Sequence, residues 1–231
     1  NSTMPPRAGP THFLCIPLAS AQLRRSLATF QADVTSINSF ALPNEAIRPP
    51  GTLHLTLGVM SLQHQDQLDK ALSLLRRLRL TDMLADARTS LAARHRGPPT
   101  KLPTGSLKIS MTGVQAMHSP SKTGVLYAPP LDSEGGTLYE FCKRLKQRFV
   151  DEGLMIEDGK ALLLHATVVN TIHVKTRGRQ RLELDARDII GKYEDYVWVD
   201  SMEVGQVAIC RMGAKAVGVD AYYEPEAEVH F

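Results

Sequence analysis

Apolar and polar residues alternate in two short segments of this chain, 53–57 and 164–168. In each segment a histidine, and two residues later a threonine, interrupt an otherwise apolar run. Because successive side chains of a strand point to opposite faces, the histidine and threonine share one face while the apolar side chains form the other. The pattern predicts two strands that each hold an imidazole and a hydroxyl on a buried scaffold. The four polar residues are His54, Thr56, His165 and Thr167.

The rest of the chain shows both helical and strand-like periodicity. Ser20 is of a type that caps helix N-termini, and Leu23, Leu27, Phe30 and Val34 follow it at helical spacing. Further helices are expected around 68–78 and after the glycine pair 135–136. The predicted strands cover 11–18, 52–60, 107–114, 124–128, 161–171, 196–199, 203–210 and 218–223. Strands therefore outnumber helices.

The spacing of the two histidine segments suggests how the chain is organised. His54 and His165 lie 111 residues apart, nearly half of the 231 residues, which predicts two similar lobes with one histidine strand each. Residues 88–105 combine glycine and proline with basic residues, a composition typical of an exposed loop. We expect one two-lobed domain over residues 11–224. Residues 1–10 are expected to be a flexible N-terminal segment or a cloning remnant.

The amino-acid composition says more about the class and location of the protein than about any reaction that it catalyses. With 43% hydrophobic and 22% charged residues, the chain is typical of a globular protein, and we expect a monomer. A net charge of +3 is compatible with an anionic ligand but does not establish one. The three cysteines are widely spaced, which favours a reducing cytoplasmic or nuclear location. No apolar run approaches the roughly 20 residues of a membrane helix, so no membrane contact is expected through this domain.

Several kinds of chemistry lack their signatures here. The sequence has no metal-binding His-x-x-x-His or Cys-x-x-Cys pair, no Gly-x-Ser-x-Gly elbow and no glycine-rich phosphate loop. Two core histidines satisfied by hydrogen bonds remain an alternative. An acid and base pair of histidines would suit phosphoester cleavage, in which one imidazole accepts a proton and the other donates one. The threonine hydroxyls would donate to phosphoryl oxygens.

The paired His-x-Thr motifs resemble the signature of the two-histidine phosphoesterase superfamily. Their surroundings are similar to one branch of it, shared by the central domain of the A-kinase anchoring protein 7 type and the phosphoesterase-like domain of the activating signal cointegrator subunit. The resemblance spans about residues 11–224. The segments that carry it are 11–18, 52–60, 125–129 and 164–171.

The resemblance implies a bilobal α+β fold in which two pseudo-symmetric antiparallel sheets, flanked by helices, surround a central cleft. It also implies that His54, Thr56, His165 and Thr167 act without metal or cofactor on RNA ends or nucleotides. Such substrates include 2′,3′-cyclic phosphates and 3′-terminal RNA linkages. The alternative is a non-catalytic module that binds AMP- or CMP-like nucleotides, or RNA, in the same cleft.

Other residues are candidates for holding the substrate. Aromatic side chains could stack on a base, and basic side chains after the second motif could contact RNA phosphates. Each also has a simpler explanation, in the core or on a solvated loop. The aromatic candidates are Phe13, Tyr127 and Tyr222, and the basic ones are Lys175 and Arg177, with Arg179 and Arg181 beside them. His12, which opens the first strand, is a weaker candidate.

Overall fold

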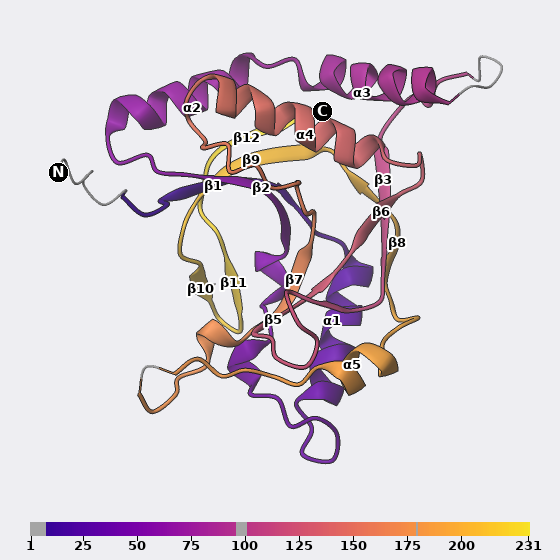
Figure 1. The fold of residues 1–231 in the computed structure, drawn as a ribbon, viewed down its shortest axis with the longest axis vertical. Coiled ribbons are helices and arrows are strands. Elements are labelled where there is room, and N and C mark those ends of the chain that lie inside the picture. The colour runs from indigo at the N-terminus through magenta and orange to yellow at the C-terminus, as the bar shows by residue number, and fades with distance from the viewer. Residues whose placement is uncertain (1–7, 96–100, 179) are drawn as a thin grey trace.

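The computed structural model describes residues 8–95, 101–178 and 180–231, which form helices around antiparallel sheets (Figure 1). The α-helices are α1 (Ala21–Val34), α2 (Gln65–Arg77), α3 (Leu80–Arg94), α4 (Thr137–Asp151) and α5 (Arg187–Lys192). Short 3-10 turns are η1 (Asn44–Ala46), η2 (Pro50–Thr52) and η3 (Thr171–His173). The strands are β1 (His12–Pro17), β2 (His54–Met60), β3 (Leu107–Thr112), β4 (Gln115–Ala116), β5 (Val125–Ala128), β6 (Pro130–Asp132), β7 (Ala166–Asn170), β8 (Val197–Val204), β9 (Gln206–Arg211), β10 (Lys215–Val217), β11 (Asp220–Tyr222) and β12 (Pro225–His230).

The two histidine strands are neighbours in the largest sheet. Its seven strands run in the order β12-β9-β1-β2-β7-β5-β4, and every pair is antiparallel. On one side β12, β9, β1 and β2 pair over several residues each, as β7 and β5 do on the other. The two halves meet where Leu55 pairs with Ala166. The strands that hold the two motifs are therefore neighbours in one continuous sheet. Smaller sheets are β6-β3-β8 and the hairpin β10-β11.

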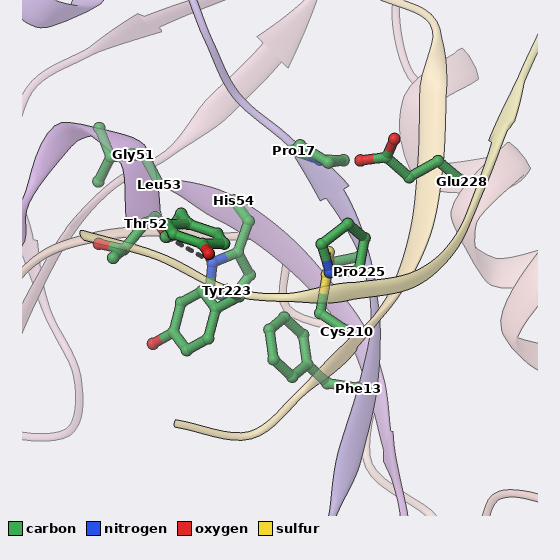
Figure 2. Close-up of a pocket in the computed structure, with 12 residues that line it drawn as sticks. Phe13, Pro17, Gly51, Thr52, Leu53, His54, Cys210, Tyr223, Pro225 and Glu228 are labelled. Atoms are coloured by element: carbon green, nitrogen blue, oxygen red, sulfur yellow. Dashed lines mark hydrogen bonds between the residues drawn. The ribbon is translucent and has the colours of Figure 1, made fainter. Parts of the chain in front are cut away.

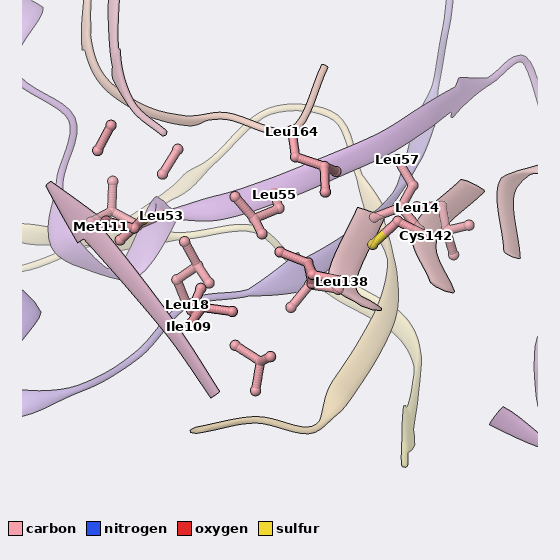
Figure 3. Close-up of a cluster of buried hydrophobic side chains, with 14 of the residues drawn as sticks. Leu14, Leu18, Leu53, Leu55, Leu57, Ile109, Met111, Leu138, Cys142 and Leu164 are labelled. Carbon is pink, nitrogen blue, oxygen red and sulfur yellow. The ribbon is translucent and has the colours of Figure 1, made fainter. Parts of the chain in front are cut away.

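The predicted alternation in β2 places a leucine face in the core. Leu55 and Leu57 are buried, and Figure 3 shows them among Leu14 from β1 and Leu138 from α4. Helices α2, α3 and α4 lie together along one side of β1, β2 and β9 (Figure 1). Removing these leucine side chains from water stabilises the fold, at roughly 25 cal/mol per Å² of apolar surface. The opposite face of β2 is left for polar side chains.

The predicted first helix is confirmed in detail. The Ser20 hydroxyl accepts a hydrogen bond from the Leu23 backbone N–H at 3.0 Å, which satisfies one of the free donors at the start of α1. The apolar residues at helical spacing are the ones that α1 buries, and they are Leu23, Leu27, Phe30 and Val34. Local sequence signals therefore suffice for this element.

The loop predicted over residues 88–105 begins later than the composition indicated. Residues 88–94 are the last turns of α3, and Arg88 is buried rather than exposed. Its guanidinium donates to both carboxylate oxygens of Glu134, at 2.8 and 2.7 Å, and to the Gly105 carbonyl. A distant carboxylate thus draws this basic residue into the interior. Residues 101–105 are exposed, and residues 96–100, within the predicted loop, lie outside the described part of the chain.

Other predicted strands also have different bounds. The residues of the strands expected over 196–199 and 203–210 divide between β8, Val197–Val204, and β9, Gln206–Arg211. The second histidine strand was expected over 161–171, but β7 spans Ala166–Asn170, so His165 comes immediately before its first paired residue. The strand expected over 218–223 is the second half of the hairpin formed by β10 and β11. The final strand, β12, pairs with β9 and had no counterpart in the prediction. These differences concern strand ends and edges, where pairing partners rather than local pattern decide the limits.

Candidate active site

Alternation along β2 brings His54 and Thr56 to the face away from the core. Leu53, Leu55 and Leu57 are buried, whereas both polar residues are half-buried. The second motif has the same arrangement, because its apolar residues are buried while His165 and Thr167 are half-buried. Those apolar residues are Leu164, Ala166 and Val168. Both histidine and threonine pairs therefore stand on rigid apolar supports.

The pairing between β2 and β7 brings the two motifs together. Leu55 pairs with Ala166 in an antiparallel register. Continued by one residue in each direction, this register sets His54 opposite Thr167, and Thr56 opposite His165. All four side chains then share the face opposite that of Leu55 and Ala166. In this register each histidine faces the threonine of the other motif.

Both imidazoles are held in the same way by the backbone two residues before them. Nδ1 of His54 lies 2.7 Å from the Thr52 carbonyl oxygen, and Nδ1 of His165 lies 2.9 Å from the Leu163 carbonyl oxygen. A carbonyl can only accept, so Nδ1 carries the proton in each ring. Nε2 is therefore the free nitrogen of the neutral imidazole, able to accept a proton. The backbone thus selects the tautomer and fixes the orientation of each ring.

Each histidine also packs beside an aromatic ring of the neighbouring strand. The ring centroids of Phe13 and His54 are 4.9 Å apart, and those of Tyr127 and His165 are 5.4 Å apart. Tyr223 adds a ring at 5.3 Å from His54, in an edge-on orientation. These contacts restrict the motion of the imidazoles and leave apolar ring surface beside them.

A cavity of about 290 Å³ opens beside His54 (Figure 2). In Figure 2 the rings of Phe13, His54 and Tyr223 lie close together, with Cys210 and Pro225 next to them, and a dashed line joins His54 to Thr52. Tyr222 also lines the cavity and is exposed. An apolar cavity edged by aromatic rings has the chemistry to receive a flat ring such as a base.

The environment of His54 favours its neutral form. Burial lowers the pKa of His54 to about 4, and the positive charges of His165 and Arg48 lower it further, against the opposing effect of the hydrogen bond with Thr52. At neutral pH this imidazole is therefore unprotonated and able to act as a base. The charge of His165 is among the lesser causes of this shift, after burial.

The predicted substrate-binding residues are placed in different surroundings. Phe13 and Tyr222 line the cavity beside His54, and buried Tyr127 packs on His165 while its hydroxyl donates to the Gln115 side chain at 3.0 Å. Lys175 and Arg177 are exposed in the segment after η3. Their role stays a prediction.

Arg181 and His12 make their hydrogen bonds and ion pair with residues outside the tetrad. Arg181 donates to the Asn170 side chain at 2.8 Å, and Arg179 lies outside the described residues. His12 is buried, with Nδ1 2.8 Å from the Thr11 hydroxyl and Nε2 3.5 Å from a Glu226 carboxylate oxygen. Its neighbours are thus those of a structural residue.

Sequence reasoning missed two residues near His54, Tyr223 and Arg48. The sequence pattern indicated Tyr222 and not its neighbour Tyr223, because strand periodicity does not tell which of two adjacent tyrosines contacts a distant histidine. Arg48 lies between two turns, before Pro49 and Pro50, where no periodicity operates. In both cases the partner is remote in sequence, and only the fold brings it near.

The described residues also allow two general findings. No helix in the ranges described is long and apolar enough to cross a membrane. Within the same ranges, no three or more His, Cys, Asp or Glu side chains are grouped so that they could hold a metal ion.

Comparisons with known proteins agree with this architecture. The family model described as "AKAP7 2'5' RNA ligase-like domain" matches residues 10–231. An uncharacterised protein of Schizosaccharomyces pombe is 24% identical over 218 residues, covering 94% of each chain. Mouse activating signal cointegrator 1 complex subunit 1 is 26% identical over 206 residues, covering 80% of this chain and 54% of that protein.

Solved structures share the fold at low sequence identity. The Escherichia coli protein LigT, in a structure with 3′-AMP, has a TM-score of 0.52 and 17% identity, over 96% of this chain and 97% of that one. TT0787 of Thermus thermophilus also has a TM-score of 0.52, with 15% identity over 95% of this chain and 97% of the other. These similarities concern the fold alone.

Proposed function

The chain belongs to the family of the AKAP7 2′5′ RNA ligase-like domain, within the two-histidine phosphoesterase superfamily, and we propose that it cleaves phosphoester bonds of RNA ends or nucleotides. One observation carries this proposal. Two imidazoles on adjacent strands each bind a backbone carbonyl through Nδ1, which leaves both Nε2 atoms available beside two hydroxyls. Such a pair can serve both ends of a phosphoryl displacement.

The proposed reaction is hydrolysis of a 2′,3′-cyclic phosphate or a 3′-terminal RNA linkage, without metal. Nε2 of neutral His54 accepts a proton from water as the water oxygen forms a bond to phosphorus. The bond from phosphorus to the 2′ or 3′ oxygen breaks, and Nε2 of protonated His165 donates its proton to that leaving oxygen. The low pKa of His54, set first by burial, supports giving it the role of base.

The threonines complete the proposed site. The hydroxyls of Thr56 and Thr167 donate to the non-bridging phosphoryl oxygens and hold phosphorus between the histidines. Phe13, Tyr222 and Tyr223 border the cavity at His54, where the base of the nucleotide would lie. The structure of LigT in complex with 3′-AMP supports a nucleotide as the occupant, because that protein shares this fold.

Turnover tests the proposal. The protein is incubated with 2′,3′-cyclic nucleotides and short RNAs with different 3′ ends, in excess EDTA, beside His54→Ala, His165→Ala and the exposed-residue control His230→Ala. We expect the first two variants to lose about 10²-fold or more in rate, and the control to match the wild type.

Two outcomes would contradict the proposal in different ways. If no substrate turns over while nucleotides bind normally, the protein is a nucleotide- or RNA-binding module. If EDTA abolishes turnover, the metal-free mechanism is wrong.

A further inference from the structure

Arg48 lies where the two halves of the large sheet meet. Its backbone N–H donates to the Val168 carbonyl at 2.9 Å, and the adjacent Ile47 forms a bridge with Val169. Only 8% of Arg48 is exposed. The segment before β2 is thereby tied to β7, so Arg48 is held in a defined position close to both motif strands.

The guanidinium of Arg48 has no acidic partner among the described residues. Its Nη2 donates a long hydrogen bond of 3.4 Å to the Tyr223 hydroxyl. Among the residues that the structure describes, no carboxylate lies within ion-pair distance of it, whereas the equally buried Arg88 is paired with Glu134. Burying an unpaired charge is costly, and a guanidinium has five donors to satisfy.

The charge of Arg48 affects the pKa of histidines in and near the candidate site. It helps to lower the pKa of His54, after the larger effect of burial. It does the same to His173 in η3, where burial is again the main cause and Arg181 adds to it. His165 and Arg48 both oppose protonation of His54, and one acidic residue, Glu228, lines the cavity. An anion bound at Arg48 would relieve the positive charge near His54.

We propose that Arg48 is a substrate-binding residue whose guanidinium holds the anionic oxygens of the phosphoryl group that lies against His54. The phosphoryl oxygens supply the negative charge that no carboxylate of the described residues provides to Arg48. Arginine suits this task, because its planar fork can bind two phosphoryl oxygens at once. Tyr223 lines the cavity and contacts both residues, because its hydroxyl accepts from the guanidinium of Arg48 and its ring packs edge-on at His54. The inference rests on the proposed function for the identity of the ligand.

Binding of phosphate would also change His54. While Arg48 is unpaired, its positive charge opposes protonation of the imidazole. Once a phosphoryl anion neutralises that charge, His54 becomes a stronger base at the moment when substrate is present. Arg48 therefore strengthens phosphate binding, and it lets His54 become more basic when the substrate is bound.

Binding measurements test the role of Arg48 independently of turnover. Inorganic phosphate and 3′-AMP are titrated into wild type, Arg48→Gln, Arg48→Lys and the exposed-residue control Arg76→Gln, with affinity from calorimetry and the pKa of His54 from NMR. We expect Arg48→Gln to bind phosphate at least tenfold more weakly and the pKa of its free His54 to rise. Arg48→Lys should lie between, and Arg76→Gln should match the wild type.

Wild-type affinity of both probes for Arg48→Gln would overturn the inference. If that variant does not fold, the wild type decides, since saturating phosphate must shift the Arg48 Nε–H resonance, and an unmoved resonance refutes the contact. Failure of the proposed function would look different. The turnover assay would then be negative while phosphate binding still depended on Arg48.

Discussion

At the scale of single residues, the hydrogen bonds to Thr52 and Leu163 turn two ordinary histidines into oriented proton carriers. The position of the histidines followed from the alternating pattern. Their tautomer did not, because it depends on which carbonyl each Nδ1 meets. The same holds for the electrostatics, since the low pKa of His54 comes from burial and from the charges of His165 and Arg48, which approach from other segments.

The pH dependence of stability provides a test at this scale. The pKa of His54 is about 4 in the fold and about 6.5 in an unfolded chain, so the unfolded state binds more protons between these values. The contribution of neutral His54 to the free energy of unfolding is therefore complete above pH 6.5 and is lost as the pH falls towards 4. We expect the wild type to lose about 2 kcal/mol more than His54→Gln between pH 7 and pH 5.

Urea unfolding at both pH values measures this difference. Equal losses in the two proteins would show that His54 is not a buried neutral imidazole. For the active enzyme, the same pKa predicts that catalytic efficiency follows a bell-shaped pH profile, with its rising limb near pH 4. A rising limb near pH 6.5 would indicate a normal imidazole instead.

At the scale of elements, the hairpin β10-β11 is held against η2 at a close approach. The Gly51 backbone N–H donates to an Asp220 side-chain oxygen at 2.9 Å, and a Cβ on Gly51 would meet the Ala221 carbonyl oxygen. Gly51 and Tyr222 both line the cavity at His54. Glycine at this position therefore allows the hairpin to form one wall of the candidate site.

Gly51→Ala should separate these two elements. Because the added methyl group meets backbone atoms that cannot simply rotate away, we expect a loss of about 1–3 kcal/mol in the free energy of unfolding. The matched control is Gly191→Ala in α5, where no atom lies within 4 Å of the added Cβ. This control should be neutral or stabilising by up to about 1 kcal/mol. Urea unfolding compares the two, and equal stabilities would refute the close contact.

At the scale of the whole molecule, a buried ion pair connects α3 to the segment before α4. Arg88 and Glu134 are both almost fully buried. Burial acts to raise the pKa of Glu134, but hydrogen bonds from Arg88 and Thr137 outweigh this effect and lower it. The carboxylate of Glu134 therefore remains ionised, and Arg88 stabilises this charged form.

Removing one partner should cost far more than removing a surface charge. We expect Arg88→Met to lose about 3–5 kcal/mol, because Glu134 is left charged and unpaired in the interior. Arg79→Met, which breaks the exposed pair with Asp82, should lose about 1 kcal/mol or less. Thermal unfolding of both variants provides the comparison. Similar small losses would mean that water reaches Glu134 in the fold.

The sequence by itself determined the local features of this protein. Alternation in β2 and around β7, helical spacing in α1 and the Ser20 cap all depend on residues a few positions apart, so their pattern can be recognised without the fold. The two His-x-Thr motifs and the family to which they point belong to this level.

Only the tertiary structure decided how the motifs meet and what surrounds them. The pairing of Leu55 with Ala166 makes the two histidine strands neighbours, and Arg48 and Tyr223 approach His54 from distant segments. Arg88 is the reverse case. The composition of residues 88–105 predicted an exposed loop, but the ion pair with Glu134, 46 residues away, places Arg88 in the interior. Such contacts depend on long-range packing, which local periodicity does not encode.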